Sequence, residues 1–364
     1  FTSSTSFTSS TSFTSSISFT SSISFTSSTS FTSFTSSPPP PHSLPPSPLV
    51  WGDESLCAGR SSFSAQQHVD AVPGSLKCSH QLFCLVLSLE FYTYSFNLEL
   101  SDGKRSIDDI NDRDLENLLV DDTHGIIYCF IPKVACSNWK KVMFVLKQGE
   151  PYRDPMSIAD DLIDPTDKHL TFLKSFPRTE MMAKLKHYTK FLFVRDPFVR
   201  IISAYRDKLQ RTNKYFYDNF GRNILRRYGN QSDPPRSLDE AFASGLSPSF
   251  HNFIQYLVDP KTENSGPFEP HWRQMHRLCH PCHIHYDFIG HQETLQDEAE
   301  QLLKLLMLQD DIKFPLAYVN MTSSVSMWDW FRTVPVEDRR KLYKLYESDF
   351  RLFGYRKPDE FLDG

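Results

Sequence analysis

Two apolar segments, each followed by a short loop and a helical pattern, most strongly constrain how this chain can fold. Residues 125–131, GIIYCFI, form a continuous apolar run typical of a buried strand, and they lead through PKVACS into a helical pattern at 139–146. Residues 189–194, TKFLFV, form a second run and lead through RDP into FVRIISAYRDKL, with a proline suited to the first helical turn. A third strand is expected at 286–290. This alternation predicts an α/β fold with a mostly parallel central sheet flanked by helices on both faces.

Three further segments are expected to form helices. Residues 106–120, SIDDINDRDLENLLV, place apolar side chains near helical spacing. Thr294 and Asp297 form a weak capping pattern ahead of AEQLLKLL. The C-terminal stretch VEDRRKLYKLYESDFRLFGY has an amphipathic pattern that should end near Gly354.

The first hundred residues are expected to lie outside this fold. Residues 1–36 repeat FTSSTS with little variation, and residues 38–49 are mostly proline and serine. Such a tract cannot bury enough apolar surface to offset the entropy lost on ordering. The sequence therefore predicts a disordered low-complexity region at 1–100, either a stem or an artefact of the gene model, and one folded domain at 101–364.

Charge is distributed unevenly along the chain. The net charge of −5 gives no global sign of a polyanion binder, but cationic side chains are dense between residues 184 and 236. Their density beside the two loops indicates an anion-facing surface more strongly than a merely solvated one. They are Lys184, Lys186, Lys190, Arg195, Arg200, Arg206, Lys208, Arg211, Lys214, Arg222, Arg226, Arg227 and Arg236.

The loop at 132–138, PKVACSN, has the features of an anion-binding turn. A helix beginning near Asn138 directs its free N–H groups and the positive end of its dipole at the loop, which favours a phosphate or sulfate oxygen. Lys133 adds a charge and Ser137 a hydroxyl donor. The Walker pattern GxxxxGK[ST] and a pair of magnesium carboxylates are both missing, which argues against an ATPase or GTPase. An ordinary turn with an exposed lysine is the alternative.

The loop after the second strand offers a partner for the first. Arg195 ends the strand, and Ser203 follows about two helical turns later. These two side chains could bind one phosphate from two sides, although Arg195 could equally pair with a carboxylate such as Asp196. Two anion loops on one sheet suggest a nucleotide with phosphate groups at both ends.

These motifs resemble those of the Golgi carbohydrate sulfotransferases. PKVACSNWKKVMFVL is similar to their 5′-phosphosulfate loop and RDPFVRIISAYRDKL to their 3′-phosphate loop. The stretches HGIIYCF, HLTF, FIQYLVDP, HWRQ, CHPCHIHYDFIG and LYKLYESDFRLFGY resemble the subgroup that contains the chondroitin 4-O-sulfotransferases and the HNK-1 sulfotransferase. The resemblance extends from about residue 107 to residue 359, and it implies a P-loop-like sulfotransferase fold.

The resemblance implies transfer of a sulfuryl group from PAPS (3′-phosphoadenosine 5′-phosphosulfate), with no metal, to the 4-hydroxyl of N-acetylgalactosamine in chondroitin. Desulfated dermatan and terminal N-acetylgalactosamine or glucuronate of other glycans are alternative acceptors, and a glycosaminoglycan-binding protein without catalysis is the alternative class. Family members are type II Golgi membrane proteins with a lumenal catalytic domain, although no apolar run here reaches the length of about 18 residues that spans a membrane. The implied donor-binding residues are Pro132, Lys133, Val134, Ala135, Cys136, Ser137, Asn138, Arg195, Asp196, Pro197, Phe198, Val199, Arg200, Ile201, Ile202 and Ser203.

Catalysis requires a cation at the leaving phosphate and a base for the acceptor hydroxyl. Lys133 is assigned to the leaving group by analogy with phosphoryl transfer. His169 in HLTF and His271 in HWRQ are the candidate bases, with His169 placed first. For each of them a structural or surface role is an equal alternative.

The cysteines and two sequons complete the candidate sites. Cys279-His-Pro-Cys282-His-Ile-His285 looks like a zinc box, but no second ligand pair is evident, so zinc is the minority hypothesis. In a lumenal setting, Cys279 and Cys282 are expected to form a disulfide with each other or to be individually buried. Asn230 and Asn320 stand in Asn-x-Ser/Thr sequons and are candidate glycosylation sites.

Overall fold

The computed structural model describes residues 107–163, 169–211, 213–316 and 327–363, all of which belong to the unit Ser62–Gly364. The predicted disordered region at 1–100 and the sequon at Asn320 lie outside the described residues.

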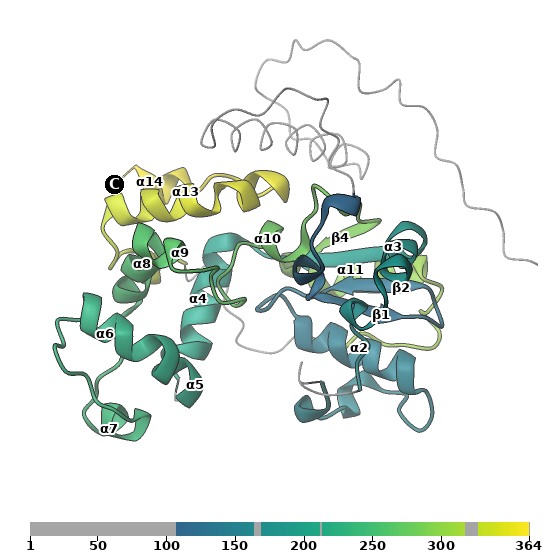
Figure 1. Ribbon diagram of the computed structural model, residues 1–364, viewed down its shortest axis with the longest axis horizontal. Coiled ribbons are helices and arrows are strands. Elements are labelled where there is room, and N and C mark those ends of the chain that lie inside the picture. The colour runs from purple at the N-terminus through teal and green to yellow at the C-terminus, as the bar shows by residue number, and fades with distance from the viewer. Residues whose placement is uncertain (1–106, 164–168, 212, 317–326, 364) are drawn as a thin grey trace, which may run out of the picture. The chain divides into compact units, whose positions relative to one another are not determined.

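A four-stranded sheet forms the centre of one half of this unit (Figure 1). Its order is β1-β2-β3-β4, with β1 antiparallel to β2 and the other pairs parallel. The predicted mostly parallel sheet with flanking helices is therefore confirmed. The strands are β1 (Leu118–Asp121), β2 (Ile126–Cys129), β3 (Thr189–Val194) and β4 (Phe288–His291).

The helices surround the sheet and form a second cluster beyond it (Figure 1). The longer ones are α2 (Cys136–Gln148), α3 (Arg178–His187), α4 (Pro197–Lys208), α8 (Phe250–Val258), α11 (Leu295–Leu305) and α13 (Val336–Leu352). The shorter ones are α5 (Lys214–Phe216), α6 (Arg222–Tyr228), α7 (Leu238–Ala243), α9 (Pro260–Asn264), α10 (His276–Cys279), α12 (Met327–Phe331) and α14 (Asp359–Leu362). Single turns lie at Ile107–Asp109, Asp112–Leu115, Pro155–Ser157, Asp160–Ile163, Leu173–Ser175, Tyr217–Gly221 and Gln292–Thr294.

The prediction of one helix over residues 106–120 is wrong. Two short 3-10 turns occupy the first part, where the Asn111 side chain accepts a hydrogen bond from the Arg113 amide and closes a local turn. The last part is strand β1, in which Leu118 pairs with Cys129 of β2. Burial of all four β1 residues against the sheet outweighs the helical spacing of the apolar residues.

The other predicted helices are present. The segment 139–146 lies within α2, and α13 ends just before Gly354, whose φ of 74° is the left-handed conformation that glycine adopts easily. Thr294 stands at the N-cap of α11 as predicted, but its hydroxyl donates to the Glu298 carboxylate rather than capping the backbone.

Helix α4 links two hydrophobic cores. The first core surrounds the sheet, where Trp139 of α2 packs against Phe191 and Phe193 of β3 with ring centroids 4.8 and 5.1 Å apart. The second core lies among α4, α8, α12 and α13, where Phe198 stacks on Phe331 at 4.7 Å. Since α4 follows β3 directly, it carries the chain from the sheet into the helical cluster (Figure 1).

Candidate active site

The loop between β2 and α2 turns without glycine. Lys133 and Ala135 both adopt positive φ, 70° and 47°, a conformation that non-glycine residues adopt only at some energetic cost. Ala135 is the N-cap of α2, and no side chain caps this helix. The first N–H groups of α2 therefore lack a capping side chain, and the positive end of the helix dipole faces the loop.

Lys133 extends from this loop to the last turn of α4. Its ammonium lies 2.8 Å from the carboxylate of Asp207, which also pairs with Lys208 at 3.1 Å. Burial lowers the pKa of Lys133, although Asp207 acts in the opposite direction. Burial also acts to raise the pKa of Asp207, but the two ammonium groups outweigh it and hold that pKa at about 2. Asp207 therefore keeps a half-buried cation beside the loop at 132–138.

The loop after β3 is built differently, because α4 caps itself. The Asp196 carboxylate accepts hydrogen bonds from the amides of Phe198 and Val199 at 2.9 and 3.0 Å. Burial raises the pKa of Asp196 to about 6, and the neighbouring Glu293 adds to this effect. The N-terminus of α4 is thus already occupied by a carboxylate. An anion here has to be held by side chains rather than by the helix terminus.

Arg195 joins the two loops. It is 5% exposed, and its Nη1 donates to the backbone carbonyl of Lys133 at 3.0 Å. Burial lowers the pKa of Arg195 to about 10. Burial disfavours the cationic form, and an anion bound at this point would favour it and so offset that cost.

Seven of the remaining predicted donor residues fall into two groups. Ser137 and Ser203 are half-buried. The apolar side chains pack in the two cores and can offer a ligand only their backbone groups. They are Val134, Phe198, Val199, Ile201 and Ile202.

The structure brings His271, not His169, to the neighbourhood of Lys133. Burial lowers the pKa of His271, and the ammonium groups of Lys208 and Lys133 lower it further against the opposing effect of Glu269. The Nδ1 of His271 lies 2.8 Å from a carboxylate oxygen of Glu269. Since a carboxylate can only accept, Nδ1 carries the proton and Nε2 is left as the basic nitrogen.

His169 lies near the other end of α2. Its ring packs edge-on against Phe144 at 5.6 Å, and its backbone carbonyl accepts a weak bond from Gln148, the last residue of α2. At 1.5 Å per residue, Phe144 is about 12 Å along the helix from its first residue. The ranking that placed His169 first therefore finds no support in its position.

Three polar residues of this cluster were not among the predicted site residues: Asp207, Lys208 and Glu269. Asp207 and Lys208 lie in the last turn of the predicted α4 helix, within the RDPFVRIISAYRDKL motif. Glu269 stands two residues before His271. A carboxylate so close in sequence to a candidate base is the signal that could have identified Glu269 as a site residue.

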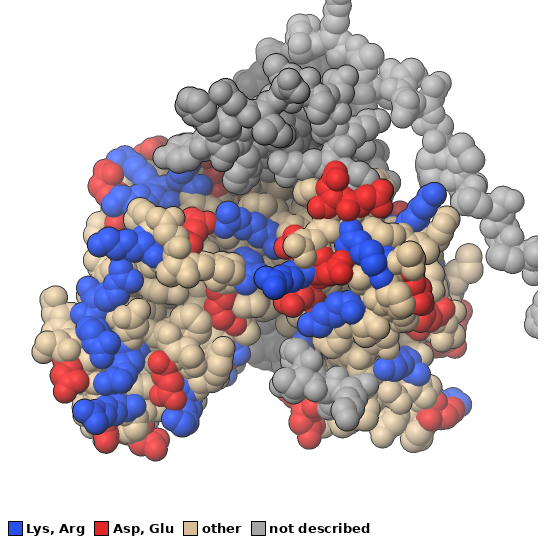
Figure 2. Space-filling model, viewed as in Figure 1, with Lys and Arg blue, Asp and Glu red and all other residues tan. Residues whose placement is uncertain are grey.

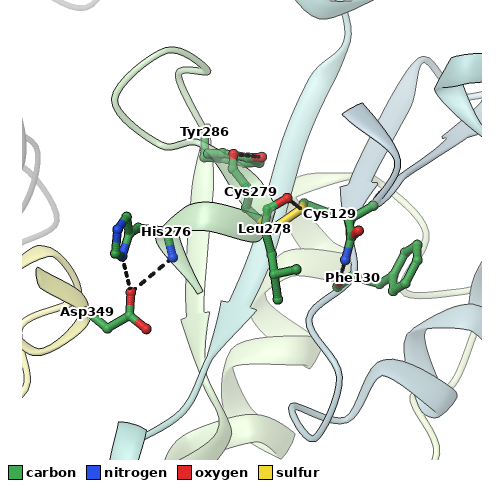
Figure 3. Close-up of a disulfide and its surroundings, with 8 residues drawn as sticks. Cys129, Phe130, His276, Leu278, Cys279, Tyr286 and Asp349 are labelled. Atoms are coloured by element: carbon green, nitrogen blue, oxygen red, sulfur yellow. Dashed lines mark hydrogen bonds and ion pairs between the residues drawn. A yellow bond between two sulfur atoms is a disulfide. The ribbon is translucent and has the colours of Figure 1, made fainter. Parts of the chain in front are cut away.

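A disulfide fixes the segment that follows His271 (Figure 3). Cys129, at the end of β2, is bonded to Cys279 of α10, with their Cα atoms 5.9 Å apart. The expected bridge between Cys279 and Cys282 is therefore wrong. Because the thiols of Cys279 and Cys282 are both committed to disulfides, the zinc-box hypothesis also loses both of its cysteine ligands. No group of three or more metal-binding side chains occurs in the described part of the chain.

The same segment is anchored to α13 by hydrogen bonds (Figure 3). The buried Asp349 carboxylate accepts from the amides of Met275 and His276 at 2.7 and 3.0 Å and contacts the His276 ring at 2.6 Å. The Tyr286 hydroxyl donates to the Cys279 carbonyl at 2.6 Å. The chain after His271 is therefore held firmly against both the sheet and α13.

A family model described as "Sulfotransferase family" matches residues 116–356, which include both loops and His271. The chain belongs to the sulfotransferase family. This confirms the family resemblance.

Individual relatives of this sulfotransferase carry carbohydrate sulfotransferase names. Carbohydrate sulfotransferase 12 of Mus musculus is 51% identical over 291 residues, 77% of this chain and 67% of the relative. The Xenopus laevis protein of the same name is 53% identical over 271 residues, 71% of this chain and 64% of the relative. Carbohydrate sulfotransferase 11 of Rattus norvegicus is 39% identical over 248 residues, 68% of this chain and 69% of the relative.

This sulfotransferase chain thus spans about two thirds of the length of these relatives. No solved structure matches it. Among the helices that the structure describes, none combines the length and the apolar character needed to cross a membrane.

Proposed function

We propose that this chain transfers the sulfuryl group of PAPS to the 4-hydroxyl of N-acetylgalactosamine in chondroitin. The observation that carries the proposal is the meeting of three segments: the uncapped α2 terminus with Lys133, the Arg195 loop, and the Glu269–His271 pair. Sulfuryl transfer needs an anion cradle, a cation at the leaving group and a base for the acceptor. The choice of chondroitin and of the 4-hydroxyl rests on the resemblance of the sequence motifs.

The donor would be held at its two ends by different means. The free N–H groups at the start of α2, with Lys133 and the Ser137 hydroxyl, suit the 5′-phosphosulfate. Arg195 and the Ser203 hydroxyl suit the 3′-phosphate through their side chains, since Asp196 already caps α4. The described residues thus offer hydrogen-bonding and cationic groups for each end of a nucleotide with phosphate groups at both ends.

The reaction follows from these positions. The acceptor hydroxyl oxygen forms a bond to sulfur while the bond between sulfur and the 5′-phosphate oxygen breaks. The Nε2 of His271 takes the hydroxyl proton, and Glu269 stabilises the resulting imidazolium through Nδ1–H. The Lys133 ammonium stabilises the negative charge that passes to the leaving phosphate. A neutral His271 is favoured by the lowered pKa that its burial causes.

The acceptor would bind along a cationic surface next to His271. Figure 2 shows Lys and Arg side chains gathered over the helical cluster that contains α6. Arg211, Arg226 and Arg236 are exposed, and none forms an ion pair with another described residue. Lys208 continues this surface to the site, where its ammonium lies 5.1 Å from the centre of the Phe216 ring. A chain of alternating uronates would complement such a row of charges.

We further propose that this sulfotransferase works in the Golgi lumen as a glycoprotein anchored in the Golgi membrane. The buried Cys129–Cys279 disulfide fits an oxidising compartment. Asn230 of the first sequon is exposed at the end of α6, where a glycan could be attached. Membrane attachment is inferred from the family resemblance alone.

The test is transfer of radiolabelled sulfate from PAPS by the full chain. Desulfated chondroitin, desulfated dermatan and glycans with terminal N-acetylgalactosamine are compared side by side, and the product disaccharides are analysed for sulfate position. We expect chondroitin to be the best acceptor and its label to lie on the 4-hydroxyl. Retention on a heparin column without any transfer would instead identify a non-catalytic glycosaminoglycan-binding protein. Label on another hydroxyl would reject the assigned position.

A further inference from the structure

Arg200 lies in the middle of α4 and is 1% exposed. Each of its three guanidinium nitrogens donates to a backbone carbonyl. Nε donates to Pro132 at 3.0 Å, Nη1 to Arg273 at 2.7 Å and Nη2 to Pro270 at 2.8 Å. No carboxylate of the described residues forms an ion pair with it. The buried guanidinium therefore holds three backbone carbonyls by hydrogen bonds.

The three carbonyls belong to the two segments that carry the chemistry. Pro132 immediately precedes Lys133, and Pro270 immediately precedes His271. The guanidinium is a rigid planar fork, so its bonds fix the donor loop and the His271 segment relative to each other. Reacting groups must be aligned closely, and a displacement of about 1 Å can lower a rate by about 100-fold.

We propose that Arg200 is a positioning residue that fixes the donor loop (residues 132–138) and the His271 segment relative to each other. It does not contact the nucleotide. The inference rests on the proposed function, because it takes Lys133 and His271 as the groups to be aligned. It departs from the reading of the RDPFVR motif as a continuous nucleotide-binding stretch. Within that motif Arg195 binds the donor, whereas Arg200 aligns the two sides of the reaction.

The test separates alignment from nucleotide binding. Arg200→Lys keeps the charge but loses the three-way fork. Its kcat for sulfate transfer is measured together with the Kd values for adenosine 3′,5′-bisphosphate and for adenosine 5′-phosphate, which lacks the 3′-phosphate. We expect kcat to fall about 100-fold while both Kd values stay at the wild-type level. Arg195→Ala serves as the contrast, because it should weaken binding of the bisphosphate and not of the monophosphate.

Arg339→Lys is the matched control for the loss of buried hydrogen bonds. Arg339 is 6% exposed and donates to the carbonyls of Val334 and Phe361, neither of which belongs to the site. This variant should lower the Tm and leave kcat unchanged. If Arg339→Lys lowers kcat as much as Arg200→Lys does, general destabilisation explains the loss and the proposal is rejected.

Two other results would also overturn the inference. A selective loss of bisphosphate affinity in Arg200→Lys would make Arg200 a nucleotide contact, and an unchanged kcat would remove its positioning role. Arg200→Gln replaces Arg200→Lys if the latter does not fold, and failure of both to fold would assign Arg200 to the fold alone. Absence of transfer by the wild-type chain would reject the proposed function itself, which is a separate outcome.

Discussion

Removal of the Cys129–Cys279 disulfide should cost this protein a large part of its stability. The two cysteines are 150 residues apart in sequence, so the bridge closes a long loop in the unfolded chain. The chain-entropy relation for a loop of this length gives about 5 kcal/mol at 25 °C, near the top of the range found for disulfides. Folded domains have stabilities of about 5–15 kcal/mol, so the double variant Cys129→Ala with Cys279→Ala should be strongly destabilised.

The assay is urea unfolding of the wild type and the double variant, followed by tryptophan fluorescence. Both cysteines are at most 1% exposed. Alanine is used in place of serine, because a serine hydroxyl buried there would lack a hydrogen-bond partner. Cys136→Ala, which removes a cysteine that forms no disulfide, is the control and should lose far less stability. A loss below about 1 kcal/mol in the double variant would refute the reasoning, because the loop-closure term would then be absent. Peptide mapping that finds Cys279 bonded to another cysteine would refute the pairing itself.

Three further predictions concern the site. Arg195→Ala and Ser203→Ala should each weaken binding of adenosine 3′,5′-bisphosphate in calorimetry, and unchanged affinity in both would reject the 3′-phosphate assignment. Asp207→Asn removes the group that raises the pKa of Lys133, so the alkaline limit of kcat/KM should move to lower pH; an unchanged limit would show that Lys133 does not set it. Burial lowers the pKa of His271, so wild-type kcat/KM should hold below pH 6.5 and fall only as the pH drops through that lowered pKa. An acid limit above pH 6.5 would contradict this assignment.

The strands that carry the site could be predicted because their signals are local. The apolar run at 189–194 coincides with β3, and the run at 125–131 contains β2. A loop that leaves a parallel strand and enters a helix is placed by topology at the carboxyl edge of the sheet. Topology therefore places the loops of Lys133 and Arg195 at the same edge of the sheet, and Arg195 donates to the Lys133 carbonyl.

The rest depends on contacts between distant parts of the chain. Leu118–Asp121 becomes a strand only because β2 is available to pair with it. Disulfide connectivity does not follow from cysteine spacing, and Cys279 bonds to Cys129 rather than to its close neighbour. Glu269 and His271 lie in irregular chain, so no periodic pattern could show that His271 lies in the neighbourhood of Lys133. Spacing likewise gave no means of ranking His271 above His169.

The most direct test of this account is single-turnover sulfate transfer at saturating PAPS and desulfated chondroitin by the His271→Ala and His169→Ala variants. General bases contribute roughly 100- to 10,000-fold, so His271→Ala should lose a factor in this range while still binding adenosine 3′,5′-bisphosphate. His169→Ala should transfer at the wild-type rate, because its ring lies against Phe144, away from Lys133. A wild-type rate for His271→Ala, or a loss confined to His169→Ala, would contradict the site described here.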